Sequence, residues 1–489
     1  MNLDSPYYTI LWACIWTTVG FHLSELNFPI SSLTCTFNAS SSASSALPSS
    51  SSFNLPQCLN MSEAIYGLVT AIFTVGGLLG SLSSSSITSR YSFKGSILLT
   101  GYVNLVGSLL MTLSPHWAVL ALGRLVSGVA SGLAICSVPP FLAVLSTVTD
   151  ELQGKKGLVG TMNQMGVVIG ICSAQMSGLI LTGEVKFLDY LKGDIPGSWR
   201  YVVLLSGVMA VFQILMAGAS VYPNNRASTI SIDSHRLNSN SPLLPNPSPS
   251  TPSISHQFTL KQVLASSTLR TPSIFCTLVM ALQQLSGVNA VMFYSTPVLK
   301  PLLPTSAGVV GVGITVVNAL VTLPALFLMD RVSRKTLLLS SISGMAATSL
   351  LLAVSLTAHF QVISAVSIVA FIASFSIGLG PVPFLLTAEV VPPLAVPALS
   401  SLAISTNWIT NFLVAIFFLP LRDLLSSPID TQAPGNRREG EGRVFYVFTM
   451  ILVLVPSQPF PQYRLDASQL DFVDWVIVDV LQSLSLNDY

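Results

Sequence analysis

The chain has 489 residues, and only 8% of them are charged, against about a quarter in soluble globular domains. Lys and Arg number 21 and Asp and Glu 20, so the net charge of +1 offers no basic excess for binding nucleic acid. Hydrophobic residues reach 51% and the mean hydropathy is +0.70, which together exclude a soluble globular enzyme and favour a chain that crosses a membrane many times.

Apolar runs long enough to cross a bilayer recur along the sequence, since such a helix needs about 20 apolar residues. Six spans are predicted in the first part, at 9–27, 64–85, 96–114, 117–142, 158–182 and 201–221. The first lacks a preceding basic region and a cleavage site, so we expect a retained helix and not a signal peptide. Five more are predicted at 271–298, 306–329, 336–357, 361–388 and 397–420, and a last apolar run covers 444–455. That run is too short for a complete span, which predicts either a divergent terminus or an altered reading frame.

A polar segment divides these spans into two groups. Residues 222–257 are rich in Ser, Pro and Asn and too polar to fold alone. We therefore expect a first six-helix half at 1–221, a cytoplasmic linker at 222–270, a second helical half at 271–455 and a divergent tail at 456–489. Weak matches at nearly equal spacing, such as Asn163 with Asn407 and Pro140 with Pro383, favour duplication of a six-helix unit.

The distribution of charge predicts which side of the membrane each loop faces. With the N-terminus in the cytoplasm, twelve Lys and Arg residues lie in inner segments and eight in outer ones, in line with the positive-inside rule. The outer loop after the first span then carries two glycosylation sequons, at Asn38 and Asn60, which are either used or chance products of a Ser-rich stretch. The same loop contains Cys35 and Cys58, a pair that could form a disulfide.

Neutral amides are the main polar groups inside the predicted spans. An amide is costly to leave unpaired in a bilayer, so it bonds a neighbouring helix or faces a wet cavity. Residues 283–289 place amides on both sides of a helix-weakening Gly287, and Asn407 and Asn411 share one helical face. A single such amide more often forms a hydrogen bond that joins two helices. As a set present in both halves, they predict a midplane site for an uncharged ligand that offers hydroxyl groups.

Several motifs resemble signatures of the sugar porter family, the glucose-transporter-like branch of the major facilitator superfamily. They lie at 123–128 (GRLVSG), 160–166 (GTMNQMG), 283–289 (QQLSGVN), 380–384 (GPVPF) and 407–412 (NWITNF), and the match runs from about Thr9 to Pro420. The resemblance implies an all-helical integral membrane protein with the major facilitator fold, in which two six-helix halves contain inverted repeats.

The resemblance also implies a sugar site between the halves. The residues implied to hydrogen-bond a hexose are Gln164, Gln283, Gln284, Asn289, Asn318 and Asn411. Phe384 stands where many relatives have a Trp under the sugar, and Ser376 where animal glucose carriers have a Glu. Phe384 keeps an apolar face but loses the indole donor. The glycines and prolines at 378–383 are expected to form a hinge.

A cytoplasmic charge cluster that acts as a gate is a further implication of the resemblance. Its members would be Arg90, Arg124, Arg331, Arg334 and Glu389. Anchoring by the positive-inside rule is an equally good explanation of the basic residues. The family pattern is incomplete, because Val144 and Val396 replace a Glu of the first half and an Arg of the second. We therefore expect Glu389 to pair with Arg331 or Arg334 instead.

The prediction is thus a multi-pass carrier of a hexose that works by facilitated diffusion, in the plasma membrane or in a vacuolar or other internal membrane. No cofactor, metal site or enzymatic activity is predicted, because no His, Cys or Gly-rich pattern has the required spacing. One alternative is proton-coupled symport through His22, which stands where proton-coupled relatives commonly have an Asp, with Glu25 one turn away. Burial disfavours a charged imidazole and so favours uncoupled transport. The other alternative is a non-transporting sugar sensor.

Overall fold

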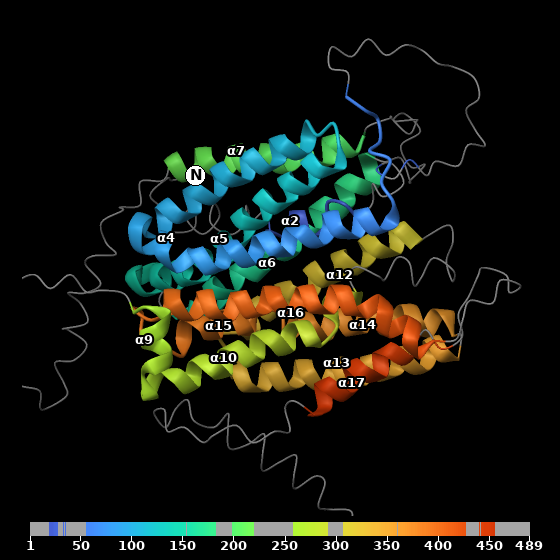
Figure 1. The fold of residues 1–489 in the computed structure, drawn as a ribbon. Helices are drawn as coiled ribbons and strands as arrows, with labels where there is room; N and C mark the ends of the chain where they lie inside the picture. The colour runs from blue at the N-terminus through green and yellow to red at the C-terminus, as the bar shows by residue number, and fades with distance from the viewer. Residues whose placement is uncertain are drawn as a thin grey trace, which may run out of the picture.

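A computed structural model describes residues 19–27, 33, 35, 55–152, 154–181, 198–219, 258–291, 307–358, 360–426, 440 and 442–454. The elements in these ranges are all helices (Figure 1). Nine of the helices within the described ranges are long and apolar enough to cross a membrane. The predicted all-helical integral membrane fold is therefore confirmed.

The first half contains five described α-helices and one short 3-10 helix. They are α2 (Val19–Ser24), α4 (Glu63–Thr112), α5 (Trp117–Val148), η1 (Asp150–Leu152), α6 (Lys156–Leu181) and α7 (Trp199–Ala219). Two predicted spans are joined in α4, which stays helical past Arg90 and breaks only at Ser92, where φ is 61°. The Ser96 hydroxyl donates to the Ser92 carbonyl at 2.7 Å, a side-chain bond within the first turn after the break. The loop predicted between these spans is thus reduced to one residue.

The second half begins inside the segment predicted as linker. Its helices are α9 (Leu260–Ala265), α10 (Ser267–Leu285), α12 (Ala307–Leu328), α13 (Arg334–Thr357), α14 (Gln361–Ile377), α15 (Val382–Glu389), α16 (Val396–Leu425) and α17 (Arg443–Leu454). A capping box formed by Thr259 and Gln262 starts α9, and α10 follows directly. The helical half therefore starts earlier than residue 271. The polar segment 222–257 and the chain after Leu454 lie outside the described residues.

Close packing of α4 on α5 forms the core of the first half. Glycines of both helices meet at this contact, where a Cβ built on Gly132 would overlap the carbonyl oxygen of Gly77, and one on Gly80 that of Val129. Small residues allow helix backbones to approach closely in a bilayer, where the hydrophobic effect does not drive helix association. The contact between α4 and α5 therefore depends on the absence of these side chains.

The two halves lie side by side, with the blue-to-green helices of the first against the yellow-to-red helices of the second (Figure 1). Across the boundary, the Ser81 and Ser405 hydroxyls are 2.8 Å apart, and the Ser401 hydroxyl donates to the Ser81 carbonyl at 2.7 Å. Where α6 begins, the amides of Gly157 and Leu158 donate to Asp330, at 2.7 and 3.0 Å. Hydrogen bonds that involve small side chains or backbone groups thus hold the halves together at these points.

We expect Gly132→Ala to lower the stability of the protein by about 1 to 3 kcal/mol, because the new methyl group must push α4 away from α5. Thermal unfolding of the purified protein in detergent measures this loss. The matched control is Gly67→Ala, at a position in α4 where a Cβ meets nothing within 4 Å. Equal unfolding temperatures for the two variants would contradict the proposed role of this contact.

Candidate functional site

Five amide side chains of the second half form one connected hydrogen-bond network. Gln283 and Gln284 lie at the end of α10, Asn289 follows a break at Gly287, where φ is +84°, and Asn407 and Asn411 lie one turn apart in α16. All are buried except Asn289, which is half-buried. The break turns the backbone so that amides before and after it reach the same face of α16.

The network starts at a second break, between α14 and α15. A continuous helix would pair the Leu379 carbonyl with the amide four residues later, but that residue is Pro383, which has no N–H. The Gln283 side chain supplies the missing donor through Nε2, at 2.8 Å from the Leu379 oxygen and 3.0 Å from the Gly380 oxygen. Gln283 therefore anchors the segment predicted as a hinge.

From Gln283 the hydrogen bonds continue through the other amides. Asn407 donates through Nδ2 to Gln283 Oε1 at 2.8 Å and to the Met280 carbonyl at 3.1 Å. Gln284 Nε2 donates to Asn407 Oδ1 at 3.0 Å. Asn289 Nδ2 then donates to Gln284 Oε1 at 2.6 Å and to Asn411 Oδ1 at 2.9 Å. Four of the six amides implied to bind sugar are thus brought together, by way of Asn407.

The remaining predicted ligands lie outside this network. Asn318 of α12 accepts a hydrogen bond from the Ser376 hydroxyl of α14 at 2.7 Å. Gln164 lies buried in α6 of the first half and shares no hydrogen bond with the five amides. Phe384 lies in α15 and belongs to the apolar core of the second half, with 6% of its surface exposed. Ser376, at the position where the resemblance implies a Glu in animal glucose carriers, therefore orients Asn318, one of the predicted sugar ligands.

Ionisable residues form a separate buried cluster in the first half. Glu25 Oε1 lies 2.9 Å from Arg124 Nη1 and 2.8 Å from His22 Nδ1. The second ring nitrogen of His22 lies 2.5 Å from Asn104 Oδ1, and Arg124 also donates to the His22 carbonyl at 2.6 Å. The guanidinium lies 4.5 Å from the centre of the Phe73 ring. All three ionisable side chains of this cluster are almost completely buried.

This cluster corrects one sequence prediction. Arg124 was expected in a cytoplasmic charge cluster with Arg334 and Glu389, but it lies in the second turn of α5 and pairs with Glu25. Those two residues, at the start of α13 and the end of α15, pair with each other. The reason for this difference is that Arg124 is buried inside the helix bundle. A buried guanidinium needs a local carboxylate, and Glu25, which directly follows α2, supplies one.

Glu389, the last residue of α15, forms an ion pair with Arg334. Arg334 contacts it with two nitrogens, Nη2 at 3.0 Å from Oε1 and Nε at 3.3 Å from Oε2, and also donates to the Met329 carbonyl. This agrees with the expectation that Arg331 or Arg334 would replace the missing Arg. Arg90 is exposed and lies over the Tyr91 ring, 5.9 Å from its centre, and Arg331 is exposed.

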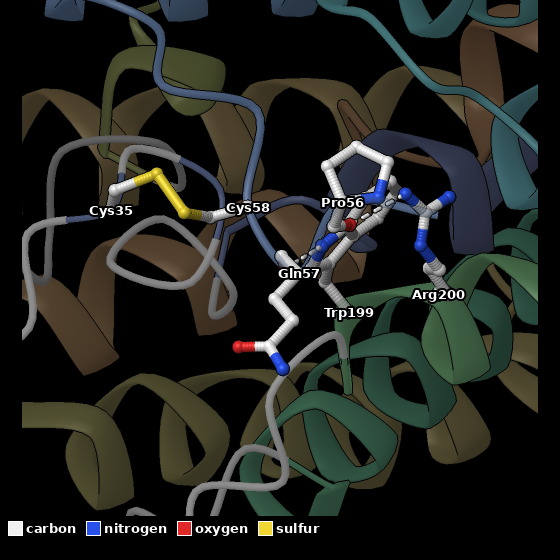
Figure 2. The surroundings of a disulfide bond; sticks show 6 residues. All are labelled: Cys35, Pro56, Gln57, Cys58, Trp199 and Arg200. Carbon is white, nitrogen blue, oxygen red and sulfur yellow. Dashed lines mark hydrogen bonds between the residues drawn. A yellow bond between two sulfur atoms is a disulfide. The ribbon is translucent and has the colours of Figure 1, made fainter. Parts of the chain in front are cut away.

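Residues 56–58, which precede α4, are held by a disulfide and by side chains of α7 (Figure 2). A disulfide joins Cys35 and Cys58, with their Cα atoms 5.5 Å apart. Beside it, the Trp199 indole donates to the Gln57 carbonyl at 3.0 Å, and Arg200 donates to the carbonyls of Pro56 at 2.9 Å and Thr112 at 2.6 Å. The disulfide therefore links Cys58 to Cys35, and the first turn of α7 holds the neighbouring Pro56 and Gln57.

The two predicted glycosylation sites differ in where they lie. Asn60 is exposed, two residues after the disulfide, and the Ser of its sequon, Ser62, caps α4. The Ser62 side-chain oxygen accepts a hydrogen bond from the Ile65 amide. Asn38 lies outside the described residues.

Comparison with known proteins agrees with this architecture. The family model described as sugar (and other) transporter matches residues 9–456. The facilitated glucose transporter member 3 of Gallus gallus is 31% identical over 75% of this chain and 74% of its own, and member 1 is 29% identical over 80% and 78%. A probable metabolite transport protein of Saccharomyces cerevisiae is 29% identical over 82% and 83%.

Solved structures share the fold. The proton:xylose symporter XylE bound to 6-bromo-6-deoxy-D-glucose superposes with a TM-score of 0.67 at 17% identity, over 93% of this chain and 95% of that one. The chain belongs to the sugar transporter family and has the fold of the major facilitator superfamily. It is a multi-pass membrane protein for sugar transport, and its family and fold are those of transporters and not of enzymes.

Sequence reasoning missed three site residues. Asn407 was recognised as a buried amide but not as the centre of the network, because its partners Gln283 and Gln284 are more than 120 residues away. Asn104 gave no signal beyond being a polar residue in an apolar run. Asp330 stands beside Arg331, and only the packing of α6 on α12 shows that it caps α6.

We expect Arg124→Met to lower stability by about 3 to 5 kcal/mol, because it leaves the Glu25 carboxylate buried without its ion-pair partner. The double variant Glu25→Gln with Arg124→Met removes both charges and should lose less. Thermal unfolding in detergent compares the two. If the double variant is as unstable as the single one, the lost stability comes from removal of the Glu25–Arg124 ion pair and not from the unpaired charge on Glu25.

Proposed function

We propose that this protein carries a hexose by facilitated diffusion, through alternating access to a site beside the amide network. The observation that carries the proposal is the network itself. Every partner of its five amides within the described residues is another amide, a backbone carbonyl or the sulfur of Met280. A site built from uncharged donors and acceptors suits a ligand that has hydroxyl groups and no net charge.

The arrangement of the helices supports alternating access. The amides lie where two helices of the second half break, at Gly287 and between α14 and α15. Broken helices near the midplane are where transporters of this architecture place their substrates. The hydrogen bonds between the halves at Ser81 and at Asp330 involve hydroxyls, backbone groups and one carboxylate, and each can break when one half rocks against the other.

Uncoupled transport is supported by the position of the charged cluster. Its members come from α2, α4 and α5, which all belong to the first half. A rigid-body motion of one half against the other leaves these contacts intact. Nothing in such a motion would load a proton on one side of the membrane and release it on the other.

Proton symport is the second candidate, and a specific contact favours it. Phe73, which packs against His22 at 6.0 Å and under Arg124, also meets the Trp408 ring of α16 edge-on, with centroids 5.7 Å apart. Trp408 directly follows Asn407 in the sequence. Movement of α16 would therefore displace the Phe73 ring through Trp408, and Phe73 contacts His22 and Arg124 of the ionisable cluster.

Uptake of radiolabelled glucose, fructose, galactose and mannose into cells without hexose carriers tests the substrate. We expect uptake of at least one hexose, with Gln284→Ala weakening its apparent affinity by about 1 to 3 kcal/mol, the range for leaving a polar partner unpaired. The matched control is Gln213→Ala, a buried amide of α7 that bonds Thr100 in the first half, which should change abundance but not affinity. Absence of all uptake, with the protein confirmed at the cell surface, would favour the sensor.

The same cells in weak buffer test coupling. Addition of the transported hexose should leave the external pH unchanged, and accumulation should stop at equal concentrations inside and outside. Alkalinisation on sugar addition that is lost in a His22→Ala variant would reject facilitated diffusion and favour symport.

A further inference from the structure

We propose that Asn407 is a positioning residue that passes the hydrogen-bond direction set by backbone carbonyls on to Gln284, Asn289 and Asn411, so that Gln284 and Asn411 present N–H donors to the sugar. Asn407 is not among the residues implied to touch substrate. This inference rests on the proposed function, since it concerns the same sugar site. Backbone carbonyls fix the direction of the network, because these groups can only accept hydrogen bonds.

The carbonyls of Leu379 and Gly380 determine the orientation of Gln283. Both oxygens lie within 3.0 Å of the same terminal atom, so that atom is the amide nitrogen, and its two hydrogens are both used. Gln283 therefore has no N–H left for a sugar. Its oxygen points to Asn407, which must place its own nitrogen there.

A third carbonyl fixes Asn407 independently. The nitrogen that faces Gln283 Oε1 at 2.8 Å also lies 3.1 Å from the Met280 carbonyl, so the two hydrogens of Asn407 are used as well. Only its oxygen remains, and Gln284 must donate to it, at 3.0 Å. Had Asn407 the opposite orientation, its oxygen would face two acceptors at once.

The direction then passes to the last amides. Because Gln284 donates to Asn407, its oxygen accepts from Asn289 at 2.6 Å, and the second hydrogen of Asn289 goes to Asn411 Oδ1 at 2.9 Å. Within the described residues, one N–H of Gln284 and both N–H groups of Asn411 remain as donors, and the Oδ1 of half-buried Asn289 remains as an acceptor. Gln284 and Asn411 are buried, with 7% and 3% of their surface exposed, so their remaining donors are available to a ligand acceptor.

The consequence for recognition is a preference between two kinds of altered sugar. A hydroxyl that faces these donors acts as an acceptor, and a fluorine in its place can still accept, although weakly. A hydrogen in its place cannot accept at all. The wild-type protein should therefore bind a deoxyfluoro analogue better than the corresponding deoxy analogue at the ring position that faces Gln284 and Asn411.

Replacing Asn407 by an apolar side chain should remove this preference. In Asn407→Leu the Gln284 amide loses its acceptor, so it is free to rotate and offer either its nitrogen or its oxygen. Asn407→Asp is the conservative variant, since a protonated carboxyl still accepts from Gln284 and still has one hydrogen for Gln283. We expect Asp to retain the preference that Leu loses.

The matched control is Asn163→Leu. Asn163 lies in α6 of the first half, 244 residues before Asn407, and is fully buried without a hydrogen-bond partner for either of its side-chain atoms. It is therefore the same substitution of a buried amide at the related position of the other half. It should leave the preference between analogues unchanged.

The experiment measures inhibition of hexose uptake by singly deoxy and singly deoxyfluoro derivatives of glucose, or of whichever hexose is transported, at each ring position. For the wild type, Asn163→Leu and Asn407→Asp, we expect an inhibition constant about tenfold lower for the fluoro analogue at one position or more. For Asn407→Leu the two constants should become similar. Surface abundance is measured for each variant, and Asn407→Ala, which removes the same bonds without added volume, replaces Leu if Leu does not reach the membrane.

The outcomes separate this inference from the proposed function. A wild type that takes up no hexose rejects the proposed function, and the inference falls with it. A wild type that takes up hexose but shows the same fluoro preference in Asn407→Leu, or no preference at any position, rejects only the role of Asn407. A general loss of maximal transport with the preference intact would show that Asn407 acts through packing alone, and would also reject it.

Discussion

Backbone carbonyls left without partners where a membrane helix breaks are the constraint on which the second half depends. The hydrocarbon core of a bilayer offers no water to satisfy such a group. At the break between α14 and α15, Pro383 removes the amide that would have paired with Leu379, and Gln283 fills the gap. This one side chain ties α10 to the break. Through Asn407, hydrogen bonds also link both of them to α16.

The two halves meet the demands of burial in opposite ways. The first half pairs Glu25 with Arg124 and encloses both of them, together with His22, almost completely. The second half connects neutral amides, which are less costly to bury and retain hydrogen-bonding capacity for a ligand. A neutral site beside a closed charged cluster can bind an uncharged solute without first stripping water from ions.

Hydrogen bonds across the boundary between the halves come from hydroxyls, backbone groups and one carboxylate. With Val144 and Val396 at the positions of a Glu and an Arg, the contacts that remain include the Ser81, Ser401 and Ser405 hydroxyls and the Asp330 carboxylate on the first amides of α6. The approach at Asp330 requires Gly157, because a Cβ there would come within 2.5 Å of the carboxylate oxygen. Such contacts are individually weak, which suits a boundary that must open.

The sequence by itself determined the class of the protein. Apolar runs of bilayer length, the near absence of charge and amides at regular helical positions depend only on local composition and periodicity, and they predicted the helices and a set of buried amides. Which of these amides bind sugar was implied only by the resemblance to the sugar porters. Tertiary structure alone decided which partner each polar group takes. Arg124 pairs with a carboxylate 99 residues away, and Asn407 with an amide 124 residues away. The direction of each amide is also a tertiary property, because it is set by distant carbonyls that no local sequence pattern specifies.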